Sequence, residues 1–535
     1  MIKISNLKLP LKFNMQDLRD IAIKQLNIKD CDIMSLEIMK LAIDTKDIED
    51  ICFKVSIGVS LYNAESEIKF KRKHKNLSYE DSVNYVTIPA NNITRPLVVG
   101  SGPAGMFAAL ILAEAGAKPI VLERGFDVDT RRKDVETFWK TGILNEQSNV
   151  QFGEGGAGTF SDGKLKPGKI DARKFKVLSE FILAGAPPEI GHLEKPHIGT
   201  DNLRVVVKNI RKKIIKLGGE VRFGTRVTDI VKKNGKIVSV FVETNDNISE
   251  IFTDNVVLAI GHSARDTFEN LYKNDVCMKQ RNFAIGVRCE HPQSYIDKLK
   301  YGKFAGNSAL GAADYRLVVH LPNGRNVYTF CMCPGGKVVA ATSEKNRLVT
   351  NGMSEFKRDG VNANTALLVT IQPGDLKDAH PLAGIEFQKQ IEERAFKSGG
   401  NNYKAPVQRL DDFMENRDSI AFGDVVSTYL PGTKFARVNE YMPEFVTDSL
   451  RQAIIEMEEW WKGFYYADAI LTGAETRTTS PVCILRNSDF QAINIKGLYP
   501  CGEGAGYAGG IISAAVDGIL CAEKIVEKSN FGGIL

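Results

Sequence analysis

Residues 95–114 read RPLVVGSGPAGMFAALILAE, and residues 120–124 read IVLER. A short apolar run, a glycine-rich turn, a long apolar stretch and a second apolar run predict a strand, a turn, a helix and a parallel strand. In such a unit Gly100 permits the tight turn, Gly102 lets a pyrophosphate approach the backbone, and Gly105 lets the helix pack closely on the sheet. The sequence therefore predicts an α/β fold with a Rossmann-like domain that binds a dinucleotide through its GxGxxG turn.

An acidic residue completes this unit. Glu123 ends the second apolar run, where a carboxylate can accept hydrogen bonds from the hydroxyls of an adenosine ribose. The helix after the turn directs its first N–H groups at the phosphates. A merely structural glycine turn is the alternative, but strand, helix and acid together favour dinucleotide binding. The contacts predicted from this segment are Gly100, Ser101, Gly102, Pro103, Ala104, Gly105, Glu123 and Arg124.

Two later segments favour FAD over NAD. Residues 253–261 read TDNVVLAIG, and residues 495–517 read IKGLYPCGEGAGYAGGIISAAVD. Both resemble flavoproteins of the glutathione-reductase-type FAD-binding superfamily, in which the first segment is the strand that returns beneath the cofactor. The resemblance implies that Glu503 lies at the ribityl or pyrophosphate part of FAD. It also implies that Gly509 and Gly510 offer backbone N–H groups to flavin O2 at a helix start, which stabilises negative charge there.

A narrower resemblance rests on three segments. They read NVQFGEGGAGTFSDGKL at 149–165, FCMCPGG at 330–336 and CGEGAGYAGG at 501–510. Together they resemble a bacterial family of uncharacterised FAD-dependent dehydrogenases (NAD(P)/FAD-dependent oxidoreductases) over essentially the whole chain, and this family brings no known reaction. A flexible surface loop is the alternative for the glycines at 153–163, but a loop laid against a flat cofactor is favoured. The further contacts expected are Gly155, Gly156, Gly158, Thr159, Val227, Ala259, Gly261, Gly502 and Ile511.

Other signals of flavoenzyme chemistry are missing. No second GxGxxG is followed by both a helix and a further strand, and the chain has no CxxxxC pair, which makes a dedicated NAD(P)H domain improbable. NAD(P)H as a transient electron donor stays open, and so does a partner protein as donor.

Candidate catalytic groups are few. Arg477 can orient an acidic substrate bidentately, or it forms a structural ion pair with Glu475 or another acid. Lys164 is placed near the flavin, with a surface lysine as the favoured alternative. Cys331 and Cys333 share one face of a predicted strand, and we interpret them as buried thiols rather than as a redox pair. The histidines His262 and His380 are possible proton donors near pH 7, although single loop histidines are more often plain hydrogen-bonding residues.

The pattern along the chain divides it into four parts. Residues 1–93 predict a small α+β module of ferredoxin-like type, with a last strand near 85–88. Residues 94–275 predict the first part of the FAD-binding domain, and 276–445 an inserted β-rich cap or substrate domain. Residues 446–535 predict the return of the chain to the FAD-binding domain.

Composition argues against a metalloprotein, a membrane protein and a nucleic-acid-binding protein. The chain has 535 residues, a net charge of +5 and nine scattered cysteines without metal-ligand spacing, so we expect no metal site and reduced thiols. No apolar run reaches the length of about 18 residues that a membrane span needs, and we expect a cytoplasmic protein. The basic run KFKRKHK at 69–75 indicates a solvated edge rather than an RNA-binding patch, so a nucleic-acid partner is not expected.

The sequence thus predicts an FAD-dependent oxidoreductase that transfers a hydride or electron pair between FAD and an unidentified small molecule. In such enzymes the flavin supplies the chemistry and the protein supplies orientation and electrostatics. An RNA-modifying flavoprotein is one alternative. A non-enzymatic FAD-binding scaffold or redox sensor is the other.

Overall fold

The predicted dinucleotide unit forms the centre of a five-stranded parallel sheet. The computed structural model describes residues 1–63, 67, 77–79, 85–91, 93–165 and 171–531. The strand order is β22-β11-β5-β6-β7, and every neighbouring pair is parallel. These strands are β5 (Leu97–Val99), β6 (Ile120–Leu122), β7 (Glu220–Arg222), β11 (Val256–Leu258) and β22 (Leu498–Pro500).

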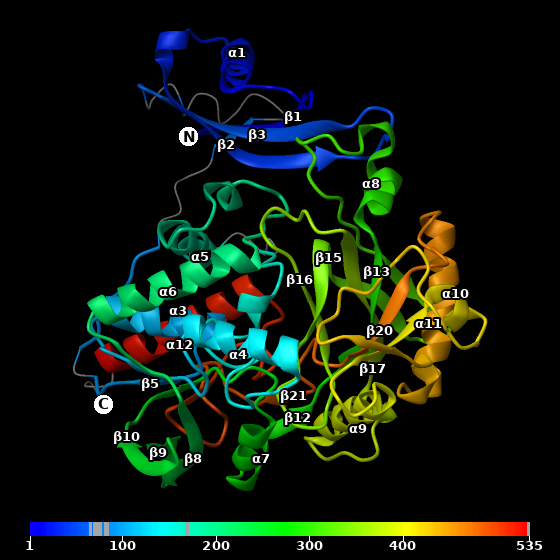
Figure 1. The fold of residues 1–535 in the computed structure, drawn as a ribbon. Helices are drawn as coiled ribbons and strands as arrows, with labels where there is room; N and C mark the ends of the chain where they lie inside the picture. The colour runs from blue at the N-terminus through cyan, green and yellow to red at the C-terminus, as the bar shows by residue number, and fades with distance from the viewer. Residues whose placement is uncertain (64–66, 68–76, 80–84, 92, 166–170, 532–535) are drawn as a thin grey trace.

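Two helices that are about 400 residues apart in sequence, α3 and α12, pack together on this sheet. The helix α3 (Pro103–Glu114) is apolar all round, because it lies between the sheet and other helices. The last helix, α12 (Ile511–Phe531), packs beside it, with Gly518 against the backbone of Ala104. The outer helices are α4 (Val128–Thr141), α5 (Ala172–Leu183) and α6 (Thr200–Lys216), and Figure 1 shows α5 and α6 over the α3–α12 pair. The segment around residues 97–114 and the carboxy-terminal end of the chain therefore build one nucleotide-binding core.

A small antiparallel sheet extends this half of the molecule. It has the order β10-β9-β8, with β8 (Thr225–Lys233), β9 (Lys236–Thr244) and β10 (Asn247–Phe252). The helix α7 (Arg265–Lys273) follows β11.

The β-rich region is an eight-stranded sheet, called the cap sheet below. Its order is β14-β15-β17-β13-β20-β18-β19, with β16 paired to β15. Its longest strand is β15 (Asn326–Ala340). The other strands are β13 (Phe283–Pro292), β14 (Val318–His320), β16 (Thr350–Met353), β17 (Asn362–Ile371), β18 (Ala405–Arg409), β19 (Thr433–Phe435) and β20 (Ile470–Glu475).

Helices pack against the cap sheet, and in Figure 1 α10 and α11 lie on its side away from the nucleotide-binding half, while α9 lies below it. They are α8 (Gln293–Tyr301), α9 (Ala383–Ser398), α10 (Leu410–Met414) and α11 (Glu444–Trp460). A two-stranded ribbon of β12 (Met278–Gln280) and β21 (Val482–Ile484) links the cap to the nucleotide-binding half.

The predicted domain boundary at 445/446 is wrong. The strand β20 lies between β13 and β18 within the cap sheet, so the chain leaves the cap after Glu475. The local sequence pattern could not show this, because β20 pairs with strands that are far away in sequence. β18 is more than 60 residues away, and β13 is further still.

The amino-terminal module is a separate antiparallel sheet of order β2-β3-β1-β4. Its elements are β1 (Ile2–Leu9), α1 (Met15–Leu26), β2 (Ile33–Asp44), β3 (Cys52–Leu61) and β4 (Leu77–Tyr79). The prediction of a last strand near 85–88 is wrong. These residues have no regular structure, and the last strand of the module is β4, which precedes them.

The ferredoxin-like assignment stays a prediction, because the segment in which a second helix would fall is mostly outside the described residues. The basic run at 69–75 lies outside them too. In Figure 1 the module caps the end of the molecule near α5 and α8, where Lys40 pairs with Glu194 at 2.7 Å. Within the described part of the chain, no helix is long and apolar enough to cross a bilayer.

Candidate functional site

A cavity of about 1060 Å³ extends from the nucleotide-binding half to the cap sheet. One end is lined by the turn after β5, the end of β6, the residues after β11 and the start of α12. The other end is lined by residues 328–332 of β15, by Glu475 of β20 and by the segment 314–316. Ligands of open parallel sheets bind at the carboxyl ends of the strands, and the cavity lies there.

The turn after β5 is shaped for a phosphate. Gly102 is the N-cap of α3, and Pro103 occupies the first helical turn, so the first N–H groups of the helix have no partner within it. A Cβ atom built on Gly102 would meet only Gly156 Cα, at 3.8 Å. Gly105 fits its predicted role, because a Cβ there would overlap the carbonyl oxygen of Gly100.

The carboxylate of Glu123 holds this turn in place. It accepts hydrogen bonds from Ser101 N at 2.8 Å, Ser101 Oγ at 2.7 Å, Gly125 N at 2.9 Å and Gly153 N at 3.0 Å. An ionised carboxylate offers about four acceptor positions, so these donors engage them all. The contact between Glu123 and a ribose hydroxyl stays a prediction. It requires one carboxylate oxygen to accept the hydroxyl in addition to its present donors.

A buried arginine that the sequence did not single out orders the glycine loop at 149–156. Arg131 of α4 has no exposed surface. Its guanidinium donates to the carbonyl oxygens of five loop residues, at 2.7 to 3.3 Å: Asn149, Val150, Gly153, Glu154 and Gly156. The loop is therefore a fixed wall of the cavity and not the flexible surface segment considered as its alternative.

The carboxy-terminal wall of the cavity is the start of α12. Gly509 and Gly510 are exposed, and a Cβ on either would meet no atom within 4 Å. The N–H of Gly509 donates to Ser513 Oγ at 3.2 Å. Glu503, the predicted acid of this segment, also lines the cavity.

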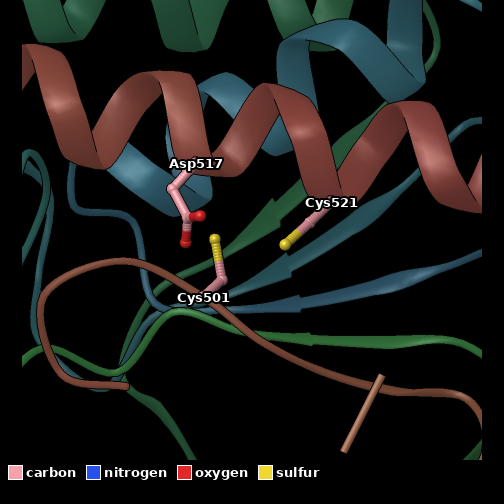
Figure 2. A group of neighbouring side chains, drawn as sticks. All are labelled: Cys501, Asp517 and Cys521. Carbon is pink, nitrogen blue, oxygen red and sulfur yellow. The ribbon is translucent and has the colours of Figure 1, made fainter. Parts of the chain in front are cut away.

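Behind this wall three buried side chains converge, as Figure 2 shows for Cys501, Asp517 and Cys521. Their ligand atoms lie within 4.8 Å of one another, a spacing that suits a metal ion. However, Arg486 donates to both oxygens of Asp517, at 2.6 and 3.0 Å, and Gly502 N donates to it at 2.7 Å. The positive charge of the Arg486 guanidinium on this carboxylate disfavours a metal cation there. The Asp517 carboxylate instead links α12 to the turn at Gly502.

Most predicted cofactor contacts line the cavity. They are Gly100, Ser101, Gly102, Pro103, Ala104, Glu123, Arg124, Gly156, Gly158, Val227, Ala259, Gly261, Glu503, Gly509, Gly510 and Ile511.

Four other predicted contacts pack behind the cavity surface: Gly105, Gly155, Thr159 and Gly502. Thr159 is buried and its hydroxyl donates to the carbonyl of Glu154 at 3.2 Å, while a Cβ on Gly502 would press on the side chain of Ala104. These residues shape the wall rather than form its surface.

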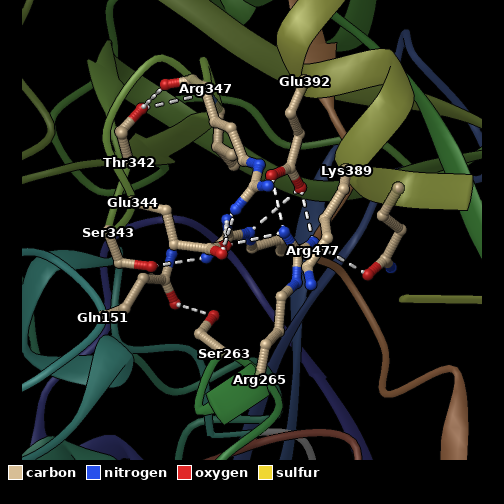
Figure 3. A network of polar contacts seen from close by, with 12 residues as sticks. Gln151, Ser263, Arg265, Thr342, Ser343, Glu344, Arg347, Lys389, Glu392 and Arg477 are labelled. Atoms are coloured by element: carbon tan, nitrogen blue, oxygen red, sulfur yellow. Dashed lines mark hydrogen bonds and ion pairs between the residues drawn. The ribbon is translucent and has the colours of Figure 1, made fainter. Parts of the chain in front are cut away.

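Arg477 forms buried ion pairs. A structural ion pair was the alternative to a catalytic role in the sequence analysis. Its partner is not Glu475 but Glu392 of α9, at 3.1 and 2.8 Å, and it also donates to Glu344 at 2.7 Å. Arg265 binds the same Glu392 at 2.7 and 2.8 Å, and Figure 3 shows both guanidinium groups around this carboxylate. Burial raises the pKa of Glu392, but Arg265 and Arg477 outweigh it and hold that pKa well below its usual range.

Lys164 lies in the cavity wall and not on the open surface. Its side chain is 24% exposed, and Nζ is 3.6 Å from Asp162. Asp162 also binds Arg358. The favoured alternative of a plain surface lysine is therefore wrong, and a role beside the flavin stays a prediction.

Two further expectations need correction. Cys331 is partly exposed and lines the cavity, so the interpretation of both thiols as buried holds only for Cys333. Burial, and then the charges of Arg477 and Arg265, lower the pKa of His262 to about 3. His262 is therefore neutral at pH 7 and cannot act as a cationic proton donor.

His380 is a plain structural residue, since it accepts a hydrogen bond from Leu382 N at 3.2 Å.

Comparisons with known proteins identify the kind of protein. A family model described as an FAD binding domain matches residues 94–148, and one described as an FAD-dependent protein, C-terminal domain-like, matches residues 282–478. Over 532 residues the chain is 50% identical to an uncharacterised protein of Clostridium beijerinckii, covering 98% of this chain and 99% of that one. The two proteins belong to one family. The two matched models make it a family of FAD-binding flavoproteins.

Solved structures resemble this flavoprotein more distantly. A geranylgeranyl bacteriochlorophyll reductase-like protein from Thermoplasma acidophilum is 15% identical, with a TM-score of 0.35 over 82% of this chain and 79% of that one. A flavoprotein/dehydrogenase from Cytophaga hutchinsonii is 12% identical, with a TM-score of 0.37 over 82% and 79%. Both TM-scores lie below 0.5, so the cofactor assignment rests on the family models and on the cavity itself.

The cavity fits FAD. Gly102, Gly509 and Gly510 leave open space where any larger side chain would intrude, and two helix starts, those of α3 and α12, direct N–H groups toward it. Helix starts attract the negative charge of a pyrophosphate or of a reduced flavin.

Proposed function

We propose that this flavoprotein is an oxidoreductase that transfers a hydride or electron pair between bound FAD and a small molecule held against the cap sheet. The observation that carries the proposal is the single cavity, whose walls come from the dinucleotide turn at one end and from β15 and β20 at the other. A scaffold that only stores FAD has no need of this second end.

We also propose that FAD lies as in the glutathione-reductase-type superfamily. The Gly100–Ala104 turn and the start of α3 would bind the pyrophosphate, with Glu123 and Arg124 at the adenosine end. Gly509, Gly510 and the start of α12 would lie at the flavin end. When bound, FAD would supply the two-electron chemistry, while these residues orient it and exclude water.

The charge of the cavity favours an anionic substrate. Its lining includes five cationic side chains in addition to Arg124, Arg226 and Arg477: Lys164, Lys174, Lys195, Arg316 and Arg358. Asp162 and Asp314 neutralise three of them. Among the described residues, Lys174 and Arg316 have no carboxylate within ion-pair distance, so a carboxylate or phosphate of a substrate would find unmatched positive charge there.

The test starts with the isolated protein. Its flavin is released and identified, and the protein is then mixed anaerobically with NADH or NADPH while the flavin absorbance is followed. Reduced protein is next mixed with small carboxylates and phosphates and with their neutral analogues. We expect faster reoxidation by an anionic compound than by its neutral analogue.

Variants sharpen this test. Lys174→Gln should weaken the response to the anionic compound, and Lys212→Gln, at an exposed position of α6, should not. Protein that binds no FAD would contradict the cofactor assignment. FAD that no donor reduces and no compound reoxidises would instead favour the scaffold alternative.

A further inference from the structure

The strand β15 is irregular where it lines the cavity. Phe330 pairs with Ala366 of β17 and Cys333 with Asn364, so three residue steps on β15 (330 to 333) oppose two on β17 (366 to 364). Cys331 has a φ of +44°, in the left-handed region that residues other than glycine rarely adopt. Backbone strain of this kind is concentrated at functional sites.

This bulge brings the two cysteines together. Two steps of a regular strand span about 7 Å, and here three steps of β15 are compressed into that length. The α-carbons of Cys331 and Cys333 are therefore closer than those of a regular i, i+2 pair, within the range of about 7 Å that a disulfide requires. The thiol of Cys333 already donates to the carbonyl oxygen of Cys331 at 3.2 Å.

The two thiols differ in their environment. Cys331 faces the cavity, whereas Cys333 is completely buried behind it. The side-chain contact with Cys333, together with the charges of Arg288 and Lys164, lowers the pKa of the Cys331 thiol against the opposing effects of burial and Asp162. The side-chain contact with Cys331 and burial raise the pKa of the Cys333 thiol.

Charged groups from each neighbouring element hold this arrangement. From β13, Arg288 donates to the carbonyl oxygen of Cys331 at 2.9 Å and binds Glu475 of β20 at 2.8 and 2.9 Å. From the loop at 161–165, the charges of Lys164 and Asp162 act on the Cys331 thiol with opposite signs. The ion pair between Arg288 and Glu475 fixes the bulge and leaves the cavity side of Cys331 open.

We propose that Cys331 and Cys333 are a redox-active dithiol that reacts with a low-molecular-weight disulfide entering the cavity. Cys331 is the attacking thiol, because it alone of the two reaches the cavity, and Cys333 is the resolving thiol. The inference goes beyond the proposed function, since it concerns the protein's own thiols and can fail while the flavin chemistry stands.

The reaction has two balanced steps. The Cys331 thiolate attacks a disulfide RSSR, forming a Cys331–S–S–R mixed disulfide and releasing RS⁻. The Cys333 thiol then attacks the Cys331 sulfur, forming the Cys331–Cys333 disulfide, and the second RS⁻ leaves with the proton of Cys333 as RSH. The two cysteines are oxidised by two electrons, and the small disulfide is reduced to two thiols.

The experiment uses full-length, FAD-replete protein in which Cys31, Cys52 and Cys277, the other three cysteines that are not buried, are replaced by serine. One equivalent of 5,5′-dithiobis(2-nitrobenzoate) is added, and release of nitrothiobenzoate is followed together with the intact mass. We expect both halves of the reagent to be released, no adduct to remain, and a peptide that carries the Cys331–Cys333 disulfide. The flavin content is measured on the same sample, and the reaction is repeated on FAD-free protein, so that a failure of FAD binding is seen separately.

Two variants assign the roles. In the same background Cys333→Ser should release one half of the reagent and keep the other as a stable adduct on Cys331, and Cys331→Ser should release at least about 10-fold more slowly. An adduct that persists on protein with both cysteines would overturn the proposal, and so would equal rates with and without Cys331. The persistent adduct is looked for on protein that keeps both Cys331 and Cys333. The proposal therefore stays testable even if a Cys331 or Cys333 variant misfolds.

Discussion

The Oε2 atom of Glu123 accepts two hydrogen bonds from Ser101, one from its backbone N–H at 2.8 Å and one from its hydroxyl at 2.7 Å. Its Oε1 atom accepts from the N–H groups of Gly125 and Gly153. One carboxylate thus joins the end of β6 to the turn before α3 and to the glycine loop. The acid at this position preorganises the phosphate turn in addition to any contact with a ribose.

Replacing Glu123 by Gln should weaken FAD binding. The amide keeps the shape of the side chain, but its NH2 group would face either Ser101 N–H or the N–H groups of Gly125 and Gly153, so at least one buried backbone donor loses its acceptor. Each buried donor without a partner costs about 1–3 kcal/mol, so we expect the Kd for FAD to rise roughly 10- to 100-fold. Titration of FAD-free protein with FAD measures this, with Glu415→Gln, an exposed position of the cap, as control. Equal affinities for the two variants would argue against this role of Glu123.

Replacing Gly102 by Asp should abolish FAD retention without unfolding the protein. The Cβ would meet only Gly156 Cα, at 3.8 Å, and the φ of −68° suits any residue. Asp is also a favourable N-cap, so the fold should be retained. The carboxylate would occupy the phosphate site and repel the pyrophosphate by several kcal/mol, or roughly 100-fold or more in Kd.

Thermal unfolding and flavin content test the Gly102→Asp variant together. Gly102→Ala is the matched control, because it adds the Cβ without the charge. A yellow, FAD-replete Gly102→Asp protein would show that the pyrophosphate lies elsewhere.

The sequence could predict the nucleotide-binding core because its signals are local. The Gly100–Gly105 turn and the apolar runs around it each specify their own element, and a parallel sheet follows from them. The sequence could not predict which cap strands are neighbours, since β20 joins β13 over a separation of well over 100 residues. Nor could it predict the partners of Arg131 and Arg477, since a guanidinium finds its acceptors only after the chain has folded. The bulge that exposes Cys331 likewise depends on its pairing with β17.

Replacing Glu392 by Gln should destabilise the protein strongly. Glu392 is fully buried between Arg265 and Arg477, and the variant leaves these two guanidinium groups with only one shared counter-ion, the partly exposed Glu344. Breaking a buried ion pair costs about 3–5 kcal/mol. Glu393→Gln is the control, since Glu393 is 45% exposed and meets Arg347 at 3.2 Å, where a change of about 1 kcal/mol or less is expected. Urea unfolding compares the two variants with the wild type.

The effect of Glu392→Gln should depend on pH. The pKa of Glu392 is lowered in the folded protein, so its contribution is complete above the unfolded value of about 4.3 and is lost as the pH falls below it. The difference in unfolding free energy between the wild type and Glu392→Gln should therefore be constant near neutral pH and should narrow toward pH 3. A difference that grows on acidification would contradict this assignment of the network.

Replacing Arg131 by Lys should loosen the glycine loop and weaken FAD binding, although the charge is retained. A lysine offers three donors on a compact ammonium group and cannot reach the five carbonyl oxygens that the planar guanidinium contacts. Leaving two or more buried carbonyls without a donor costs at least about 2 kcal/mol, so the Kd for FAD should rise roughly 10-fold or more, with faster proteolysis within 149–156. Arg132→Lys is the matched control, because the neighbouring Arg132 is half exposed and pairs only with Glu136, among the described residues, at 3.2 Å. If Arg131→Lys bound FAD as tightly as Arg132→Lys, the loop would owe its order to Glu123 and Gly153 rather than to the guanidinium.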